Sequence, residues 1–373
     1  MCVTFIAGDF SDAKTVGVNR ALCLDNPTKQ RKLQFERGHR TCGFVRCHTP
    51  VNRRRFIALT LGAAGGFGLA SHLLPRNLKR VEQKSFALGT EVSLIAFHKC
   101  RDTAECAVTA AFKALDELED VLSLYRPQSQ ICRLNREGIL KRPHPDILTV
   151  VRSALDWSRL TDGAFDPTVQ PLWPLYALGK PPQSAELETA RRLVNWRQVH
   201  LDATQIRLAP GQQITLNGIA QGFAVDRVVE IFRSHGIKHA LLNTGEFGAL
   251  GNRPDGNPWQ IGIQHPRVRE AYSALAALSD RFLSTSGDYE TKFSDDFSSH
   301  HIFDPATGRS PTELSSVTVL APTGMEADAL STALFVLGPS RGVELAASRS
   351  NVDAFLVLKN GEVVFTPNFP KVA

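Results

Sequence analysis

The sequence predicts an α+β fold, because segments with helical periodicity and segments with strand patterns occur in separate runs rather than in strict alternation. Apolar residues recur at helical spacing over residues 103–124, 145–160, 218–235 and 325–337. The last of these helices is expected to end at Gly338, which is followed by Pro339. The 373 residues have an ordinary globular composition, with 43% hydrophobic and 21% charged residues. This composition excludes collagen, a coiled coil and a fully disordered chain.

The remaining elements are predicted from turn residues and from β-branched and aromatic residues. Residues 81–97 carry such residues around Gly89 and Thr90, and are expected to form a hairpin or a long bent strand. Residues 167–182 are rich in proline and are expected to form a loop region, after which Ser184 begins a short helix. Short strands are expected within 199–216 and at 240–243, 259–264, 274–278, 282–285, 317–320, 354–358 and 362–365.

The chain carries a net charge of +6, but the excess of basic residues lies at its N-terminal end. Residues 1–75 hold 11 Lys and Arg and 4 Asp and Glu, which leaves 32 basic and 33 acidic residues for the rest of the chain. Because the body is nearly neutral, the charge pattern gives no support to a nucleic-acid partner, and we expect none. The sequence does not indicate an oligomeric state.

Residues 51–75 are expected to be a twin-arginine signal peptide. Arg53 and Arg54 come shortly before an uncharged apolar run, and this order is typical of an export signal. The run is rich in Gly and Ala and makes a poor membrane span, which needs ~20 residues, so a permanent anchor is the less favoured alternative. We therefore expect a periplasmic protein, attached to the inner membrane only if the signal is not cleaved.

Residues 1–50 stand in front of this signal and show no sustained hydrophobic period. The only methionines are Met1 and Met325, so no internal Met lies nearer to the signal. We expect translation to begin at Val51 from a non-standard start codon, and residues 1–50 to be a misassigned or disordered extension. The catalytic domain is expected to cover residues 76–373.

Two candidate metal ligands lie in the helix predicted at 325–337. Asp328 and Thr332 are four residues apart, so their oxygens lie on the same face of that helix. A carboxylate and a hydroxyl are hard oxygen ligands of the kind that suits Mg²⁺. Alternatively, Asp328 stands near the helix start because the helix dipole favours a carboxylate there.

Two polar segments follow the predicted strands in the second half of the chain. Residues 285–289, TSGDY, are expected to form a small-residue turn between two strands. Residues 300–308 form a polar turn that contains His301, whose ordinary pKa near neutrality suits a general base. Taken alone, a single histidine is more often a hydrogen-bonded structural residue.

A glycine-containing turn, NGIAQG at residues 217–222, follows a strand pattern and opens a helix. The backbone N–H groups of such a turn are placed to bind phosphate. The turn has neither the G-x-G-x-x-G order of a dinucleotide-binding fold nor the lysine of a P-loop. Tight packing between strand and helix explains its glycines equally well.

Three further segments make the order of these motifs more informative. Residues 88–90 read LGT, residues 122–127 read LSLYRP, and residues 163–169 read GAFDPTV, followed by a Pro-Leu pair. The turn at Gly218 and the segments 285–289, 301–308 and 328–332 come next. From roughly residue 83 to the C-terminus, this order resembles the ApbE family, the FAD:protein FMN transferases, with its Met-Gly-Thr start and its G-x-[FM]-D-x-T-V-x-P-L block.

The resemblance implies an ApbE-like, two-lobed single catalytic domain with mixed sheets and packed helices. It implies that FAD and Mg²⁺ bind, and that FMN is transferred from FAD to a Ser or Thr hydroxyl of a flavoprotein with release of AMP. Asp328 and Thr332 would hold the metal with the Gly218 carbonyl, and His301 would act as the base. The residues implied for the flavin or adenine pocket are Leu88, Tyr125, Ala164, Phe165, Asp166, Thr215, Gln221 and Phe303.

The chain departs from the family's pattern at several positions. Thr215 stands where the family usually has Asp, and Gln221 stands where it usually has Lys or Glu. Leu88 replaces Met, and Phe223 replaces Tyr. Charged groups are therefore missing from the expected nucleotide pocket, whereas the expected metal ligands and the expected base are present.

Three functions remain open, of which we favour the transferase. A Mg²⁺-dependent FAD pyrophosphatase needs the same metal site with water as the nucleophile, and a non-catalytic FAD-binding protein needs only the pocket. Exported members of the family serve membrane-bound respiratory flavoproteins, so the expected partner is an acceptor flavoprotein of a membrane respiratory complex. The segment 217–222 and the twin-arginine signal resemble the branch of the family linked to nitrous-oxide respiration.

Overall fold

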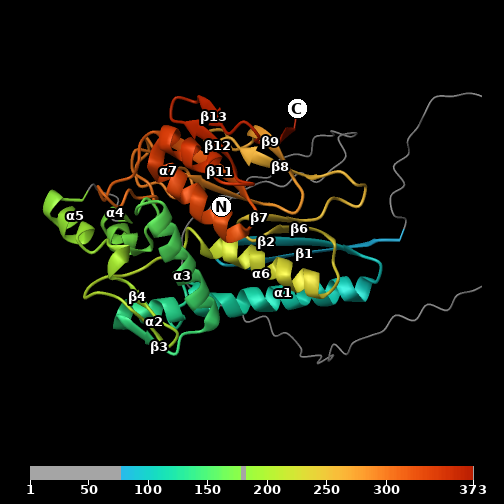
Figure 1. Ribbon diagram of the computed structural model, residues 1–373, viewed down its shortest axis with the longest axis horizontal. Helices are drawn as coiled ribbons and strands as arrows, with labels where there is room; N and C mark the ends of the chain where they lie inside the picture. Colours follow the sequence, from blue (N-terminus) through green and yellow to red (C-terminus); the bar gives the residue numbers. More distant parts are fainter. Residues whose placement is uncertain (1–76, 178–181, 373) are drawn as a thin grey trace, which may run out of the picture. The chain divides into compact units, whose positions relative to one another are not determined.

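A sheet of eight strands lies at the centre of the part of the chain that the computed structural model describes, residues 77–177 and 182–372 (Figure 1). Its order is β1-β2-β6-β7-β10-β11-β12-β13, and all neighbouring strands are antiparallel. The strands are β1 (Lys79–Ala87), β2 (Thr90–His98), β6 (His239–Asn243), β7 (Phe247–Leu250), β10 (Phe282–Gly287), β11 (Leu314–Ala321), β12 (Asp353–Leu358) and β13 (Val363–Phe365). The extension predicted at 1–50 and the signal predicted at 51–75 lie outside the described residues.

Two smaller sheets complete the strands of the described ranges. The first has the order β14-β9-β8 and the second the order β3-β5-β4. Their strands are β8 (Trp259–Gln264), β9 (Tyr272–Leu278), β14 (Lys371–Val372), β3 (Ile139–Lys141), β4 (His200–Leu201) and β5 (Gln205–Arg207). Side chains of β8 and β9 share an apolar core with one face of the large sheet.

Helices cover the opposite face of the large sheet and form a smaller lobe beside it (Figure 1). The covering helices are α1 (Arg101–Leu122), α6 (Ala220–Ser234) and α7 (Gly324–Ala347). The other helical elements are α2 (Gln130–Glu137), α3 (Pro145–Leu160), η1 (Pro167–Leu172), α4 (Trp173–Ala177), α5 (Ser184–Arg191) and η2 (Trp196–Gln198). No helix in the described residues is both long and apolar enough to cross a membrane.

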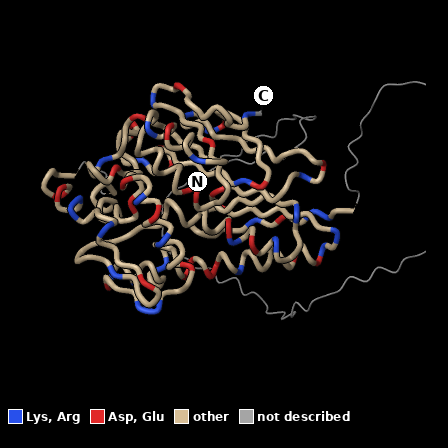
Figure 2. The backbone as a smooth tube through the Cα atoms, in the orientation of Figure 1, with Lys and Arg blue, Asp and Glu red and all other residues tan. Residues whose placement is uncertain are grey.

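The layered arrangement explains why the strands of the large sheet are so apolar. On β2, Leu94 and Ala96 belong to the core beneath the helices, whereas Ile95 belongs to the core beneath β8 and β9. Because successive side chains of a strand point to opposite faces, both faces of β2 are buried. Outside this core, Figure 2 shows Lys and Arg interspersed with Asp and Glu along the described backbone, in keeping with its near-neutral composition.

The α+β prediction is confirmed, and the strand directions are more uniform than the mixed sheets that we expected. Residues 167–177 are not a loop but form η1 and α4. Pro167 is the first residue of η1, where the missing N–H costs no hydrogen bond, and Asp166 caps it by accepting from Thr168 N. Proline therefore begins helical structure here.

Further differences lie at element ends. The helical stretch that begins α7 ends at Gly338, as expected, because Gly338 has non-helical backbone angles with a φ of 77°. A second helical stretch, which the sequence did not predict, follows this kink and continues to Ala347. Residues 285–287, expected in a turn, belong to β10. The sequence analysis also missed α2, β3, β7 and β14, of which three are strands of two to four residues, too short for a periodic pattern.

The starts of α6 and α7 are held against each other without intervening side chains. A Cβ atom on Gly222 would lie 2.2 Å from the Gly324 carbonyl oxygen, and a Cβ on Gly324 would lie 2.3 Å from the Gly222 carbonyl oxygen. The Asp226 carboxylate of α6 accepts hydrogen bonds from Gly324 N and Met325 N, at 2.7 and 3.0 Å. In return, Gly222 N donates to Asp328 Oδ2 of α7 at 2.9 Å. This reciprocal contact is called the α6–α7 clasp below.

We predict that Gly222→Ala destabilises the protein. Alanine is intrinsically favoured over glycine within a helix by about 1 kcal/mol, but here its Cβ would meet backbone atoms, which cannot rotate away. We expect the free energy of unfolding to fall by about 1–3 kcal/mol, as for other overpacked cores. Urea denaturation of the purified variant measures this change, and an increase in stability would contradict the clasp.

Candidate active site

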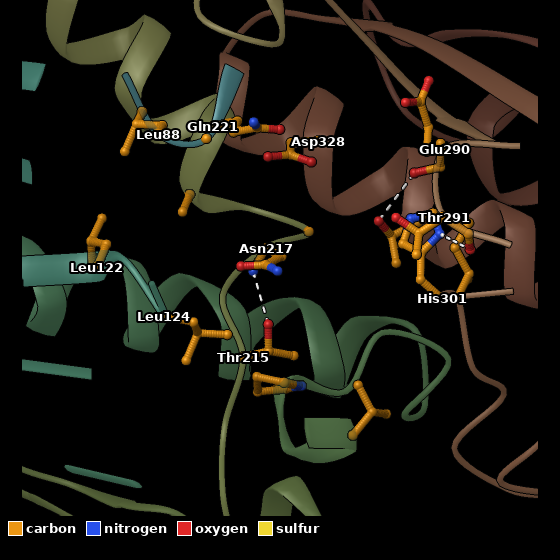
Figure 3. A pocket seen from close by; sticks show the side chains of 18 of the residues that line it. Leu88, Leu122, Leu124, Thr215, Asn217, Gln221, Glu290, Thr291, His301 and Asp328 are labelled. Atoms are coloured by element: carbon orange, nitrogen blue, oxygen red, sulfur yellow. Dashed lines mark hydrogen bonds between the residues drawn. The ribbon is translucent and has the colours of Figure 1, made fainter. Parts of the chain in front are cut away.

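One cavity of about 830 Å³ opens beside the α6–α7 clasp. Its wall comes from the β1–β2 turn, the end of α1, the segment before η1, the starts of α6 and α7, and the segment that follows β10. Figure 3 shows Leu88, Gln221 and Asp328 along one side, Thr215 and Asn217 across from them, and His301 at one end. All twelve residues singled out from the sequence line this cavity: Leu88, Tyr125, Ala164, Phe165, Asp166, Thr215, Gly218, Gln221, His301, Phe303, Asp328 and Thr332.

The candidate metal ligands lie close together on α7 and on the turn before α6. A Cβ on Gly218 would lie 2.9 Å from Thr332 Oγ1, so only glycine lets the backbone approach this hydroxyl so closely. Thr332 Oγ1 is also 3.2 Å from Ser286 Oγ. Asp328, one helical turn before Thr332, is only 3% exposed. A hydroxyl and a carboxylate thus line one part of the cavity, beside the backbone of Gly218.

The electrostatics of this part favour a cation. Burial raises the pKa of Asp328 to about 7, although Gly222 N donates to the carboxylate. Burial, followed by the nearby Asp328 charge, raises the pKa of Glu246 well above its ordinary value. Among the residues that the structure describes, neither carboxylate is paired with a Lys or Arg side chain. A positive charge would therefore stabilise the ionised form of both.

Glu246 is a residue that the sequence analysis did not place in the site. It is 3% exposed and lines the cavity, and Thr285 N donates to its Oε2 at 3.3 Å. The sequence signal was a glutamate directly after Gly245, in a tight turn between two strands. Because a glutamate after a glycine turn is common on protein surfaces, its burial could not be read from the sequence alone.

The donor set fits a magnesium ion better than a transition metal. No group of three or more His, Cys, Asp and Glu side chains within 77–177 and 182–372 is arranged to hold a metal ion. Mg²⁺ usually binds through one or two carboxylates together with water and substrate phosphates. One carboxylate and one hydroxyl beside a large cavity match that requirement.

His301 is half-buried at the end of the cavity, edge-on to Trp173 at a ring distance of 6.5 Å. Its Nδ1 is 3.3 Å from the Thr291 carbonyl oxygen, and its backbone N donates to the same oxygen at 3.0 Å. Since a carbonyl oxygen only accepts, Nδ1 of the neutral ring carries the hydrogen and Nε2 carries the lone pair. Burial lowers the pKa of His301 below its ordinary value of 6.5, which keeps the ring neutral at pH 7.

The preceding residue, His300, has a different role. It is fully buried, its Nε2 is 3.0 Å from the Pro311 carbonyl oxygen, and its ring packs edge-on against Phe335. Burial lowers the pKa of His300 to about 4, so it stays neutral within the core. It does not line the cavity. Of the two adjacent histidines, only His301 is placed for chemistry there.

The segment 288–301, which carries His301, is held by an ion cluster around the buried Asp288. Asp288 is fully buried and accepts from both Nη atoms of Arg267, at 2.7 and 2.8 Å, and from Lys359 Nζ. Lys359 Nζ also donates to the Phe297 carbonyl oxygen at 2.6 Å, and the Arg267 guanidinium lies 4.0 Å from the Phe297 ring centre. The cluster thus fixes the first residue and the tip of the segment that positions His301.

The residues expected in the nucleotide pocket fall into two groups. Tyr125 is exposed at the cavity mouth, whereas Phe165 and Phe303 are buried in its wall. The Asp166 carboxylate is occupied within the protein: it accepts from Thr168 N, Thr168 Oγ1 and Trp196 N. Asp166 therefore stabilises the backbone of the cavity wall at Thr168 and Trp196, and its carboxylate is already used within the protein. Burial outweighs these hydrogen bonds and raises its pKa.

The sequence of the region that forms the cavity matches a known family. The model of the ApbE family matches residues 88–356. The chain belongs to the ApbE family. This match confirms the resemblance drawn from the motifs, and it covers every segment of the cavity wall except Phe86.

Individual relatives agree with this membership. An FAD:protein FMN transferase of Haemophilus influenzae is 31% identical over 306 residues, which cover 74% of this chain and 88% of the relative. One of Vibrio cholerae is 32% identical over 263 residues, 67% of this chain and 78% of the relative. The crystal structure of the ApbE protein from Thermotoga maritima aligns with a TM-score of 0.72 and 27% identity, covering 79% of this chain and 100% of that one. The crystal structure of the flavinyl transferase ApbE of Pseudomonas stutzeri, in its apo form, aligns with a TM-score of 0.70 and 31% sequence identity. The alignment covers 78% of this chain and 95% of that one.

We predict that Asp288→Asn loosens the segment 288–301. Without the carboxylate, the partly exposed Arg267 and Lys359 lose the buried partner that they share. The charge-assisted hydrogen bonds that anchor the start of the segment are then lost. Hydrogen exchange followed by mass spectrometry should show the amides of residues 291–301 exchanging roughly tenfold faster, about 1.4 kcal/mol of local stability.

The matched control for this variant is Asp353→Asn. Asp353 is also buried, and it pairs with Arg281 at 2.8 Å on β12, away from the cavity. We expect this variant to leave exchange in 291–301 unchanged. Equal effects of the two variants on that segment would contradict the positioning role of Asp288.

Proposed function

We propose that this chain is an FAD:protein FMN transferase, which moves the FMN part of FAD onto a Ser or Thr hydroxyl of an acceptor flavoprotein and releases AMP. One observation carries the proposal. In a member of the ApbE family, a neutral histidine and a set of hard oxygen ligands, from distant parts of the sequence, face a single cavity. The names of the bacterial relatives support the same reaction.

Asp328, Thr332 and the Gly218 carbonyl would hold Mg²⁺, with the Glu246 charge nearby. When bound, the ion would neutralise the charge that develops on the pyrophosphate as it is cleaved. The protein's own contribution is to keep these oxygens fixed. The α6–α7 clasp holds Asp328 through the hydrogen bond from Gly222 N. Thr332 is held by the contact between its hydroxyl and that of Ser286, and it fits there because Gly218 has no side chain.

His301 would act as the general base. Its Nε2, which carries the lone pair, would accept the proton of the acceptor hydroxyl. The hydroxyl oxygen then forms a bond to the phosphorus of FMN, the bond from that phosphorus to the bridging oxygen breaks, and AMP leaves with that oxygen. Because burial lowers the pKa of His301, the rate should fall as pH decreases through this lowered value.

The flavin or adenine rings would lie against Leu88, Tyr125, Ala164, Phe165 and Phe303. Thr215 and Gln221 line the cavity as uncharged hydrogen-bonding residues. Thr215 Oγ1 accepts from Asn217 N at 3.2 Å, so it stabilises the turn before α6 as well as facing the cavity. Binding of the nucleotide is therefore proposed to rely on stacking and neutral hydrogen bonds more than on charge at these positions.

The acceptor is proposed to be a flavoprotein of a membrane respiratory complex in the periplasm. The twin-arginine motif at Arg53 and Arg54 supports export, and the variant turn at 217–222 supports the nitrous-oxide branch. Export by this route carries folded proteins, which suits an enzyme whose site needs the complete domain.

We predict that the wild-type protein, incubated with FAD, Mg²⁺ and the flavoprotein encoded by a neighbouring gene, modifies that acceptor with FMN and releases AMP in equal amount. Mass spectrometry of the acceptor and chromatography of the nucleotides measure both products. His301→Ala should reduce transfer by about 10²–10⁴-fold, the usual contribution of a general base, with the dissociation constant for FAD unchanged. Release of AMP without modification of the acceptor would instead indicate a pyrophosphatase, and no AMP would indicate a binding protein.

The matched variant is Asp328→Ala, which removes the only carboxylate among the proposed ligands. Its activity should be lost at every Mg²⁺ concentration, an effect far larger than the fall in melting temperature that follows from losing the hydrogen bond to Gly222 N. Wild-type turnover of this variant at low Mg²⁺ would show that the metal assignment is wrong. A structural role for His301 would lower stability, FAD affinity and rate together.

We predict that replacing both Arg53 and Arg54 with Lys leaves the precursor in the cytoplasm, because the export machinery reads the arginine pair. Cell fractionation followed by immunoblotting measures how much of the wild-type protein and of the double variant remains in the cytoplasm. A single replacement of Arg55, which lies beside the pair, serves as the control. Unchanged export of the double variant would rule out the twin-arginine route.

A further inference from the structure

A row of hydroxyl groups leads from Thr332, the proposed metal ligand, into the core between β10 and α7. Thr332 Oγ1 is 3.2 Å from Ser286 Oγ, which is 2.8 Å from Ser331 Oγ. The row ends at Ser284, whose Oγ is 3.2 Å from that of Ser331. Because residues two apart on a strand point to the same face, β10 presents both of its serines to α7. Ser284 and Ser331 are fully buried and do not line the cavity.

The direction of the hydrogen bonds in this row is set at Ser331. Its Oγ also lies 2.9 Å from the carbonyl oxygen of Asp328, about one helical turn earlier. A hydroxyl has one hydrogen to donate and two lone pairs with which to accept, whereas a carbonyl oxygen only accepts. Ser331 therefore donates to Asp328, and towards the other hydroxyls of the row it can only accept. The reverse arrangement would place a lone pair of Ser331 against the carbonyl oxygen, which is a repulsive contact.

This direction passes along the row to Thr332. Ser286 gives its single hydrogen to Ser331 and has none left for Thr332. In the contact between Ser286 and Thr332, the hydroxyl of Thr332 is therefore the donor. Its hydrogen points to Ser286, and its lone pairs remain available to the cavity that it lines. A hydroxyl binds a cation through a lone pair, so this is the orientation that a magnesium ligand needs.

The far end of the row does not alter this result. The Ser284 hydroxyl has two acceptors within reach, Ser331 and the Glu246 carboxylate. Whichever of them it donates to, Ser331 has no second hydrogen to return. The Asp328 carbonyl therefore sets the direction, and it belongs to the residue whose carboxylate is the other proposed side-chain ligand. The backbone of Asp328 thus orients one ligand while its side chain supplies another.

We propose that Ser331, acting through Ser286, is a positioning residue for the magnesium site, because it turns the Thr332 hydroxyl so that a lone pair faces the ion. The inference rests on the metal ligands of the proposed function. It gives a role to a residue that touches neither the metal nor the substrate. Groups that orient metal ligands from behind typically contribute about 10–100-fold to the affinity for the metal. Without Ser331, the Ser286 hydrogen is free to turn to Thr332, whose own hydrogen then points to the cavity.

The test compares Ser331→Ala with the wild-type protein and with a matched control. Calorimetric titration of Mg²⁺ into the FAD-loaded protein, with the acceptor omitted, measures the affinity for the metal. Ser331→Ala should weaken Mg²⁺ binding at least about tenfold, with the dissociation constant for FAD, measured without Mg²⁺, unchanged. The control is Ser158→Ala on α3, which should leave the affinity for Mg²⁺ unchanged. Ser158 is also fully buried and away from the cavity wall, and its Oγ donates to a carbonyl oxygen of its own helix, that of Ala154, at 2.8 Å.

A second background shows whether the effect runs through Thr332. Thr332→Val removes the hydroxyl that Ser331 orients, so adding Ser331→Ala to it should change the affinity for Mg²⁺ by less than about twofold. An equal loss in both backgrounds would overturn the inference, because Ser331 would then act on another part of the site. So would an unchanged affinity in Ser331→Ala, or an equal loss in Ser158→Ala.

Neutron diffraction by crystals of the metal-free wild-type protein in heavy water tests the orientation directly. The deuterium of Ser331 should point to the Asp328 carbonyl oxygen, and that of Thr332 to Ser286 Oγ. A deuterium on Ser286 that points to Thr332 would contradict the proposed direction. If the wild-type protein binds no Mg²⁺, the metal site of the proposed function fails and the inference fails with it. If Mg²⁺ binds as expected but the acceptor receives no FMN, the role of Ser331 stands and the proposed transfer reaction fails.

Discussion

The close approach of α6 and α7 is the constraint on which the rest of the structure depends. Two glycines, Gly222 and Gly324, bring the helix starts into backbone contact, and each helix supplies a carboxylate for N–H groups of the other. The same two turns carry Gln221 and Asp328 into the cavity wall. The same contacts therefore pack the core and place the site residues. A substitution that disturbs the packing of the two helix starts would also displace the site.

This arrangement has an electrostatic cost. Burial raises the pKa of Asp226 to about 6 and that of Asp328 to about 7, although both accept backbone hydrogen bonds. A carboxyl group whose pKa is raised on folding holds a proton that the unfolded chain has lost, so its contribution to stability declines between its ordinary value of 3.8 and about 7. Near neutral pH the empty site is thus less stable than the packing alone would make it, and a bound cation would offset the difference. The buried carboxylate of Asp328 thus suits the binding of a cation but lowers the stability of the fold near neutral pH.

The sequence predicted most of the architecture because its patterns are local. The helices at α1, α3 and α6 and the β1–β2 hairpin follow from periodicity and from turn residues, and the family's motifs identified every residue that was expected at the cavity. Burial was harder to predict. Glu246 follows a glycine turn, a position more common on protein surfaces, yet its side chain is buried at the cavity. The adjacent His300 and His301 look alike in sequence, although one faces the core and the other the cavity. The ion cluster around Asp288 joins residues 267, 288 and 359, and only the folded chain brings them together.

The cavity wall draws on residues from Phe86 to Thr332, so a fragment that lacks either end of this range lacks part of the site. Ligand binding must therefore be linked to unfolding of the whole domain rather than to the melting of one element. A nucleotide held at a hundred times its dissociation constant adds about 2.7 kcal/mol to the stability of everything that the cavity joins together. The supply of substrate in the cell would thus govern how long the folded protein persists, as well as how fast it works.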